Sequence, residues 1–340
     1  MKSKVLLVCS ESPYPLVVGG FERLVSDYQS HVFRDYDVYL LVINPAGRME
    51  LLHYGEAVPD AAVRSFLLEE RFEFSLFIEP GLGDRNQELI GRLTDRIPSF
   101  CFVQRHPQPK IDEALFRGIV THWSDEPRDD VLRLGGSYNP GVFFRRGNGK
   151  KEEFIICVAR IASQKNQHEL VRHYKERIYD TFGLPLYLAG GTQTPAYFRR
   201  RVYPYMDGVA VSGTIDPRAP AAPCSWKSAE EVAELYSRAR LFVMASPSES
   251  FCLSMIEAMA CGLTCVVNGN YFGFDEADLR PNVFGPITGK RGHILDTVAA
   301  ALEQDIRIDA SEWAAKYAVD EIGSQLLGFI QSRLQVKRTR

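Results

Sequence analysis

The sequence predicts an α/β protein built of two doubly wound domains, with a ligand cleft between them. Its 340 residues exceed what one core needs and suit two domains of about 150 residues each. Short apolar, β-branched-rich runs alternate with amphipathic stretches, which is typical of parallel strands covered by helices. The alternation stops at a polar, glycine-containing segment, 145–151, and then starts again, as expected at a domain linker.

The first domain is predicted to span 1–147. Strands are expected where short runs of apolar and β-branched residues occur: 4–9, 37–43, 73–79, 99–104 and 118–122. Helices are expected in the stretches between these runs: 20–32, 57–70, 84–96 and 125–134.

The second domain is predicted to span 148–318 and to repeat this alternation. Its expected strands are short apolar runs: 154–159, 184–189, 208–212, 240–245 and 263–267. Its expected helices lie between and after them: 166–178, 194–204, 228–238, 251–261 and 291–304. Apolar residues recur three or four apart from 310 to 335, which predicts a further helix. We expect the end of the chain, 319–340, to be a C-terminal helix that packs back on the first domain.

The composition is that of an ordinary globular protein. Charged residues make up 24% of the chain and the formal net charge is −3, so no overall attraction to DNA or RNA is expected. We therefore expect no nucleic-acid partner. Local basic clusters occur at 145–146, 150–151, 199–201 and 337–340, and the plainer interpretation of them is solvated surface charge.

Neither a targeting nor a membrane-spanning segment is evident. The apolar run at 5–9 is too short for a signal peptide, and no stretch approaches the roughly 18 apolar residues of a transmembrane helix. We expect a cytoplasmic protein, which can still touch the inner face of a membrane. The seven cysteines have no paired spacing, so buried, reduced thiols are expected rather than disulfides or a zinc site.

The most informative stretch is SPSESFCLSMIEAMACG, residues 246–262. It predicts a strand end, a turn, and a helix that starts near Ser250 and Phe251, with Ser248 or Ser250 as its cap. A helix that begins at the carboxyl end of a parallel strand offers its free N–H groups to an anion such as phosphate. The stretch therefore predicts a phosphate site.

Two glutamates belong to this stretch. Glu249 lies just before the predicted helix, and Glu257 lies within it among apolar residues. A buried carboxylate is costly unless it is hydrogen-bonded, and two neighbouring ribose hydroxyls would satisfy Glu257. The structural alternatives stay open: Glu249 only interacts with the helix dipole, and Glu257 only accepts a bond from a backbone amide.

The spacing of these glutamates resembles the E-x7-E motif of the GT4 family of glycosyltransferases, and EAMACG resembles the family's EAMA-x-G. The resemblance implies a GT-B fold of two Rossmann-like domains facing a cleft. It also implies transfer of a sugar, with retention, from a UDP- or GDP-type nucleotide-diphosphate sugar. The acceptor it implies is a glycan, a lipid-linked molecule or a small molecule. In the family, a peripheral membrane contact often accompanies such acceptors.

The segment that follows the first strand of the second domain, CVARIASQKN, resembles the family's G-R-x4-K motif. The resemblance makes Arg160 and Lys165 the residues that clasp the donor diphosphate. Two fixed cations beside a helix N-terminus would neutralise the leaving group. The alternative is a solvated loop.

Weaker similarities concern other turns of the family. They imply donor-binding roles for glycines and their neighbours: Gly19, Gly20, Gly190, Gly191, Gly213 and Thr214. His106 follows a strand of the first domain, where the family often has a histidine facing the reacting sugar, although a lone histidine is more often structural. The family usually has glycine where this chain has Cys252.

In this interpretation, the helix N-terminus at Phe251, Cys252 and Leu253 and the two cations stabilise the departing diphosphate. Glu249 positions the donor sugar through its hydroxyls. Neither a metal nor another cofactor is expected, because no Asp-x-Asp pair sits at a strand end. Two other classes remain: another nucleotide-sugar enzyme on this fold, such as an epimerase, hydrolase or phosphorylase, and a non-catalytic nucleotide-sugar-binding protein. A dinucleotide oxidoreductase is disfavoured, because no strand is followed by G-x-G-x-x-G.

Overall fold

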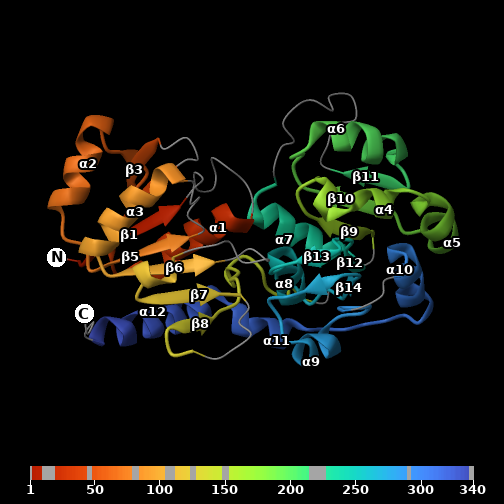
Figure 1. The fold of residues 1–340 in the computed structure, drawn as a ribbon. Helices are drawn as coiled ribbons and strands as arrows, with labels where there is room; N and C mark the ends of the chain where they lie inside the picture. Colours follow the sequence, from red (N-terminus) through yellow and green to blue (C-terminus); the bar gives the residue numbers. More distant parts are fainter. Residues whose placement is uncertain are drawn as a thin grey trace. The chain divides into compact units, whose positions relative to one another are not determined.

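The computed structural model describes residues 2–9, 20–43, 48–78, 84–103, 112–122, 128–147, 153–213, 227–288 and 292–336 (Figure 1). The chain divides into two compact units. The first unit combines Met1–Ser137 with Val319–Arg340, and the second is Tyr138–Ala318. Both units are parallel sheets with helices, which confirms the predicted α/β fold class.

Among the described residues, the first unit contains an eight-stranded sheet in the order β4-β3-β2-β1-β5-β6-β7-β8. All neighbouring strands are parallel except β3, which is antiparallel to β2 and β4. The strands are β1 (Lys4–Cys9), β2 (Asp37–Ile43), β3 (Met49–His53), β4 (Glu56–Ala57), β5 (Phe74–Ile78), β6 (Ser99–Val103), β7 (Gly118–Thr121) and β8 (Val131–Arg133).

The central strands β1, β5 and β6 are buried along almost their whole length. Strands covered on both faces have near-continuous apolar sequences, and KVLLVC in β1 is such a run. The helices of this unit are α1 (Gly20–Asp27), α2 (Asp60–Glu69), α3 (Asp84–Arg96) and α12 (Val319–Gln335). A π-helical turn, Tyr28–Val32, continues α1.

The C-terminal helix α12 packs within the first unit. Its Phe329 ring lies 6.2 Å from the ring of Phe100 in β6. A Cβ atom added at Gly118 in β7 would lie 2.7 Å from the Phe329 ring, so a larger residue there would require the ring to shift. Gly323 of α12 meets Val32 in the same close manner.

The described part of the second unit contains a five-stranded parallel sheet in the order β11-β10-β9-β12-β14. Its strands are β9 (Ile155–Val158), β10 (Leu186–Ala189), β11 (Val211–Gly213), β12 (Leu241–Met244) and β14 (Cys265–Val267). The chain order reverses between β9 and β12. In doubly wound sheets ligands bind at this switch point, outside the carboxyl ends of the strands.

Helices and short turns flank this second sheet (Figure 1). They are α4 (Gln167–Val171), α5 (Asp180–Phe182), α6 (Pro195–Tyr197), α7 (Ala229–Arg238), α8 (Leu253–Ala260), α9 (Glu276–Leu279), α10 (Ile294–Glu303) and α11 (Ser311–Ala314). No described helix is long and apolar enough to cross a membrane.

Several expected elements differ in the structure. The helix predicted at 125–134 is wrong, because Val131–Arg133 pair with β7 as the edge strand β8. A three-residue strand is too short for its periodicity to be distinguished from a helical turn. The strand β3 was not predicted. The helix at 251–261 starts later than expected, at Leu253, because Ser248–Glu249 form a short strand, β13.

His122, at the end of β7, makes the stability of the first unit depend on pH. Its buried ring bonds the carbonyl of Leu134 through Nδ1 at 2.8 Å, and burial lowers its pKa from 6.5 to about 4. The unfolded chain therefore binds this proton first, and stability should fall as the pH drops from about 6.5 to about 4. Each pKa unit corresponds to about 1.4 kcal/mol, so the loss should approach about 3 kcal/mol.

The variant His122→Asn keeps a donor toward Leu134 but cannot be protonated. Urea unfolding of both proteins at pH 7 and pH 4.5 should show a clearly smaller pH dependence in the variant. Equal pH dependence of the two proteins would show that His122 does not control it.

Candidate active site

A short strand and a turn connect β12 to α8 and set the position of Glu249. Ser248–Glu249 form β13, which pairs in parallel with β15 (Asn270–Tyr271). The chain then enters α8 with Cys252 as its N-cap residue, which makes no side-chain capping bond. The expected caps, Ser248 and Ser250, are therefore not the N-cap, because β13 holds the chain extended up to Glu249.

Lys165 and Glu249 form an ion pair in the second unit. The Lys165 Nζ lies 2.7 and 2.8 Å from the two carboxylate oxygens of Glu249. The Glu249 side chain is only 8% exposed and that of Lys165 21% exposed. The two residues lie 84 positions apart, after β9 and after β12, so the sheet brings them together across the switch point. A carboxylate this buried needs such a partner.

The segment with Arg160 is held tightly against the turn after β10. The Ile161 amide donates to the Gly191 carbonyl at 2.7 Å. Gly190 has φ +149°, and a Cβ atom there would lie 2.0 Å from the Ala159 carbonyl oxygen. The Gln167 amide donates to the Arg160 carbonyl at 2.8 Å. The backbone that presents Arg160 is thus fixed from two sides.

Two further predicted site residues lie near Glu249 in the sequence: Glu257 within α8 and Phe251 just before it. Glu257 is 2% exposed and faces the interior of the unit. The Phe251 ring stacks on Phe274, with ring centroids 4.4 Å apart, and it also meets Tyr317 edge-on. This aromatic contact fixes the chain just before α8.

Cys252 occupies the N-cap of α8 with a buried thiol. Burial, followed by the nearby Glu249 carboxylate, raises its pKa to about 12. Burial raises the pKa of Cys157, in β9, to about 12 as well. The raised pKa values of both thiols disfavour a thiolate nucleophile at these positions.

Three buried polar groups near this site were not predicted from the sequence. The Tyr271 hydroxyl, Gln167 Oε1 and Asn268 Oδ1 have no hydrogen-bond partner among the described residues. Tyr271 pairs with Glu249 across β13 and β15, and burial raises its pKa well above 10. Only the pairing of the two short strands brings Tyr271 beside Glu249. Strands of two residues have no recognisable sequence pattern, so this pairing could not be predicted.

Some predicted site residues cannot be placed. Gly19, His106 and Thr214 lie outside the described residues. Gly20 is the first residue of α1, in the first unit. Gly213 ends β11, where a Cβ atom would lie 2.6 Å from the Leu188 carbonyl oxygen. Within the described ranges, no group of three or more His, Cys, Asp or Glu side chains could hold a metal ion.

Comparison with known proteins gives a family match within the second unit. Residues 152–280 match the family described as Glycosyl transferases group 1. No curated protein matches the chain.

Solved structures resemble the chain at low sequence identity. HepE from Anabaena, crystallised with UDP and glucose, is 11% identical, with a TM-score of 0.68 over 97% of this chain and 100% of that one. A glycosyltransferase from Rickettsia africae is 11% identical, with a TM-score of 0.68 over 99% and 100%. The pneumococcal O-GlcNAc transferase GtfA, crystallised with UDP and GlcNAc, is 12% identical, with a TM-score of 0.59.

The match to GtfA covers 84% of this chain but 63% of GtfA, so the chain spans less than two thirds of that protein. At these identities the likeness shows the fold. The chain therefore has the GT-B fold, and its residues 152–280 match a glycosyltransferase family.

Proposed function

We propose that the chain transfers a sugar, with retention of configuration, from a nucleotide-diphosphate sugar to a hydroxyl acceptor. The observation that supports this most is the Lys165–Glu249 ion pair at the switch point of the second sheet. It brings together one residue from each of the two motifs that the sequence analysis assigns to the donor. Several of the similar structures were crystallised with UDP or a UDP sugar.

In this proposal Lys165 and Arg160 stabilise the departing diphosphate. The bond between the sugar and the diphosphate breaks with positive charge on the sugar and negative charge on the leaving phosphate. Preorganised cations and a helix N-terminus lower the energy of that charge where water is excluded. The first turn of α8, at Leu253, would supply backbone amides for the same phosphate.

Glu249 is proposed to bind hydroxyls of the donor sugar. The ion pair with Lys165 offsets the cost of burying this carboxylate. A bound diphosphate would compete with Glu249 for Lys165. This would release lone pairs of the Glu249 carboxylate, which could then accept hydrogen bonds from the sugar. Glu257 is proposed to bind the ribose hydroxyls. The leaving phosphate would help to deprotonate the acceptor on the face from which it departs.

The acceptor is proposed to be a glycan, lipid-linked or small molecule. The arginines of the π-helical turn Phe198–Val202 are exposed, and such residues favour an anionic surface. A peripheral contact with the inner face of a membrane thus stays a prediction.

Nucleotide binding tests the proposal directly. A ligand that binds only the folded state raises the melting temperature by mass action. We expect one nucleoside diphosphate, UDP or GDP, and its sugar conjugates to raise the melting temperature, whereas AMP and NAD do not. No shift with any nucleotide diphosphate would contradict the proposed function.

Metal removal gives a second test. No cofactor or metal is proposed, because the positive charges of Arg160 and Lys165 would balance the negative charge of the diphosphate. Transfer measured with excess EDTA should proceed at the rate measured without it. A rate that is lost with EDTA and restored by Mn²⁺ or Mg²⁺ would mean that the charge is balanced by a metal instead.

A further inference from the structure

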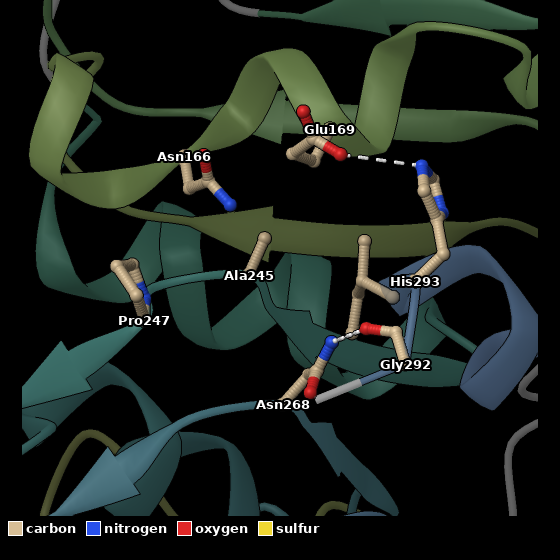
Figure 2. A pocket seen from close by; sticks show the side chains of 8 residues that line it. Asn166, Glu169, Ala245, Pro247, Asn268, Gly292 and His293 are labelled. Atoms are coloured by element: carbon tan, nitrogen blue, oxygen red, sulfur yellow. Dashed lines mark hydrogen bonds and ion pairs between the residues drawn. The ribbon is translucent and has the colours of Figure 1, made fainter. Parts of the chain in front are cut away.

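A pocket of about 260 Å³ lies in the second unit, at the carboxyl ends of β9, β12 and β14. Figure 2 shows its side chains, which come from the segments after these strands and from the start of α10. The lining includes Asn166, which follows Lys165, and Pro247, which lies two residues before Glu249. The pocket therefore adjoins the proposed donor site, but none of its side chains has a role in the transfer described above.

A carboxylate flanked by two histidine rings forms one wall. Glu169 Oε2 lies 3.3 Å from His293 Nε2, and Glu169 Oε1 lies 3.2 Å from His168 Nε2. The Leu295 amide donates to His293 Nδ1 at 3.2 Å, so Nδ1 is the acceptor and Nε2 carries the ring proton. The Nε2 side of the His293 ring thus faces the Glu169 carboxylate. The Glu169 side chain is 39% exposed, so its remaining lone pairs can accept bonds from a ligand.

Two carboxamides form the rest of the polar lining. Asn268 is 7% exposed, and its Nδ2 donates to the Gly292 carbonyl at 2.8 Å. Its Oδ1 is buried and has no partner among the described residues. Asn166 has a left-handed backbone, with φ 57° and ψ 27°. In Figure 2 the Asn166, Glu169, Asn268 and His293 side chains surround the same hollow.

The lining chemistry fits a neutral, hydroxyl-rich ligand. Carboxylate and amide oxygens accept bonds from hydroxyls, and Ala245, Pro247 and Ile294 offer apolar surface to C–H groups. No Lys or Arg is among the described residues that line it, and the Glu169 carboxylate repels a phosphate. Pockets for drug-sized ligands measure about 300–1,000 Å³, so this pocket suits a smaller group, such as one sugar ring.

We propose that this pocket binds one sugar ring of the substrates, with Glu169 and Asn166 as hydrogen-bonding residues. This inference rests on the proposed glycosyl transfer. The ring belongs either to the nucleotide-sugar donor or to the acceptor, and the two sources share the same chemistry. Binding measurements separate them.

The test compares the variants Glu169→Gln and Asn166→Gly with wild type by calorimetry. Glycine tolerates the left-handed backbone at 166, so this variant removes the carboxamide without strain. Glu176→Gln, at an exposed glutamate of the turn Lys175–Tyr179, is the matched control. The probes are UDP, GDP, UDP-glucose, GDP-mannose, and the methyl α-glycosides of glucose and mannose with and without saturating nucleotide.

If the pocket holds the donor sugar, both variants should bind the nucleotide sugar about 10-fold more weakly and the nucleotide as wild type does. If it holds the acceptor, both should lose binding of the methyl glycoside and keep the affinity for nucleotide and nucleotide sugar. The control should match wild type throughout. Asn166→Gly keeps the test valid if Glu169→Gln destabilises the unit.

Three results would overturn the inference. They are unchanged affinities in both variants, an equal loss for nucleotide and nucleotide sugar, and a wild-type protein that gains nothing from any sugar. Failure of every nucleotide to bind would contradict the proposed function instead. The glycosides measured alone would then still report on the pocket.

Discussion

Replacing Lys165 or Arg160 with alanine is expected to lower kcat/KM for the nucleotide sugar by about 30- to 1,000-fold, equivalent to about 2–4 kcal/mol of transition-state stabilisation. Each variant removes a cation that faces charge developing on the leaving diphosphate. Lys175→Ala is a suitable control, because Lys175 pairs with Asp180 at an exposed site and should leave kcat/KM unchanged. Wild-type kcat/KM in both Lys165→Ala and Arg160→Ala would show that the motif has been misassigned.

The two variants should differ in stability. Lys165→Ala leaves the buried Glu249 carboxylate without its ion-pair partner, which lowers the free energy of unfolding. Arg160→Ala breaks no ion pair among the described residues and should unfold like wild type. Combining Lys165→Ala with Glu249→Gln should restore much of the stability but none of the activity. A double variant as unstable as Lys165→Ala would contradict the account of the pair.

Gly190→Ala is expected to destabilise the second unit by about 3 kcal/mol or more and to abolish most activity. Its Cβ atom would lie 2.0 Å from the Ala159 carbonyl oxygen, so the segment that presents Arg160 must move. Gly208→Ala is the matched control, because Gly208 also has a positive φ, +79°, but has no atom within 4 Å of the added Cβ. The control should lose only about 1–2 kcal/mol.

Urea unfolding and kcat/KM of the two alanine variants decide this prediction. Equal losses in Gly190→Ala and Gly208→Ala would mean that the close approach to Ala159 has no energetic consequence. A stable Gly190→Ala protein with wild-type turnover would show in addition that the Arg160 segment is not fixed by this turn.

The parts of the fold that could be predicted are those with long apolar runs. KVLLVC in β1 is buried on both faces, and only a central strand explains such a run. The antiparallel strand β3, MELLH, was missed, because it is short and joins the sheet through pairing with β2 that no local pattern encodes. The edge strand β8 was missed for the same reason.

The site divides in a similar way. Motif spacing predicted roles for Lys165 and Glu249, but their contact joins residues far apart in the sequence and depends on the order of β9 and β12. The pocket beside them could not be predicted, because Glu169, Asn268 and His293 belong to no motif. Only the sheet, which aligns the ends of three strands, brings them together.

The stereochemistry of the product tests the central claim most directly. With an α-linked gluco- or galacto-configured donor, the anomeric proton coupling in an NMR spectrum of the first-formed product distinguishes retention from inversion. Retention fits the proposal in which Lys165 and Arg160 hold the leaving phosphate on the face that the acceptor attacks. Inversion requires a general base on the opposite face. We predict an α-linked product, and a β-linked product would contradict the mechanism together with the roles proposed for Glu249 and Glu257.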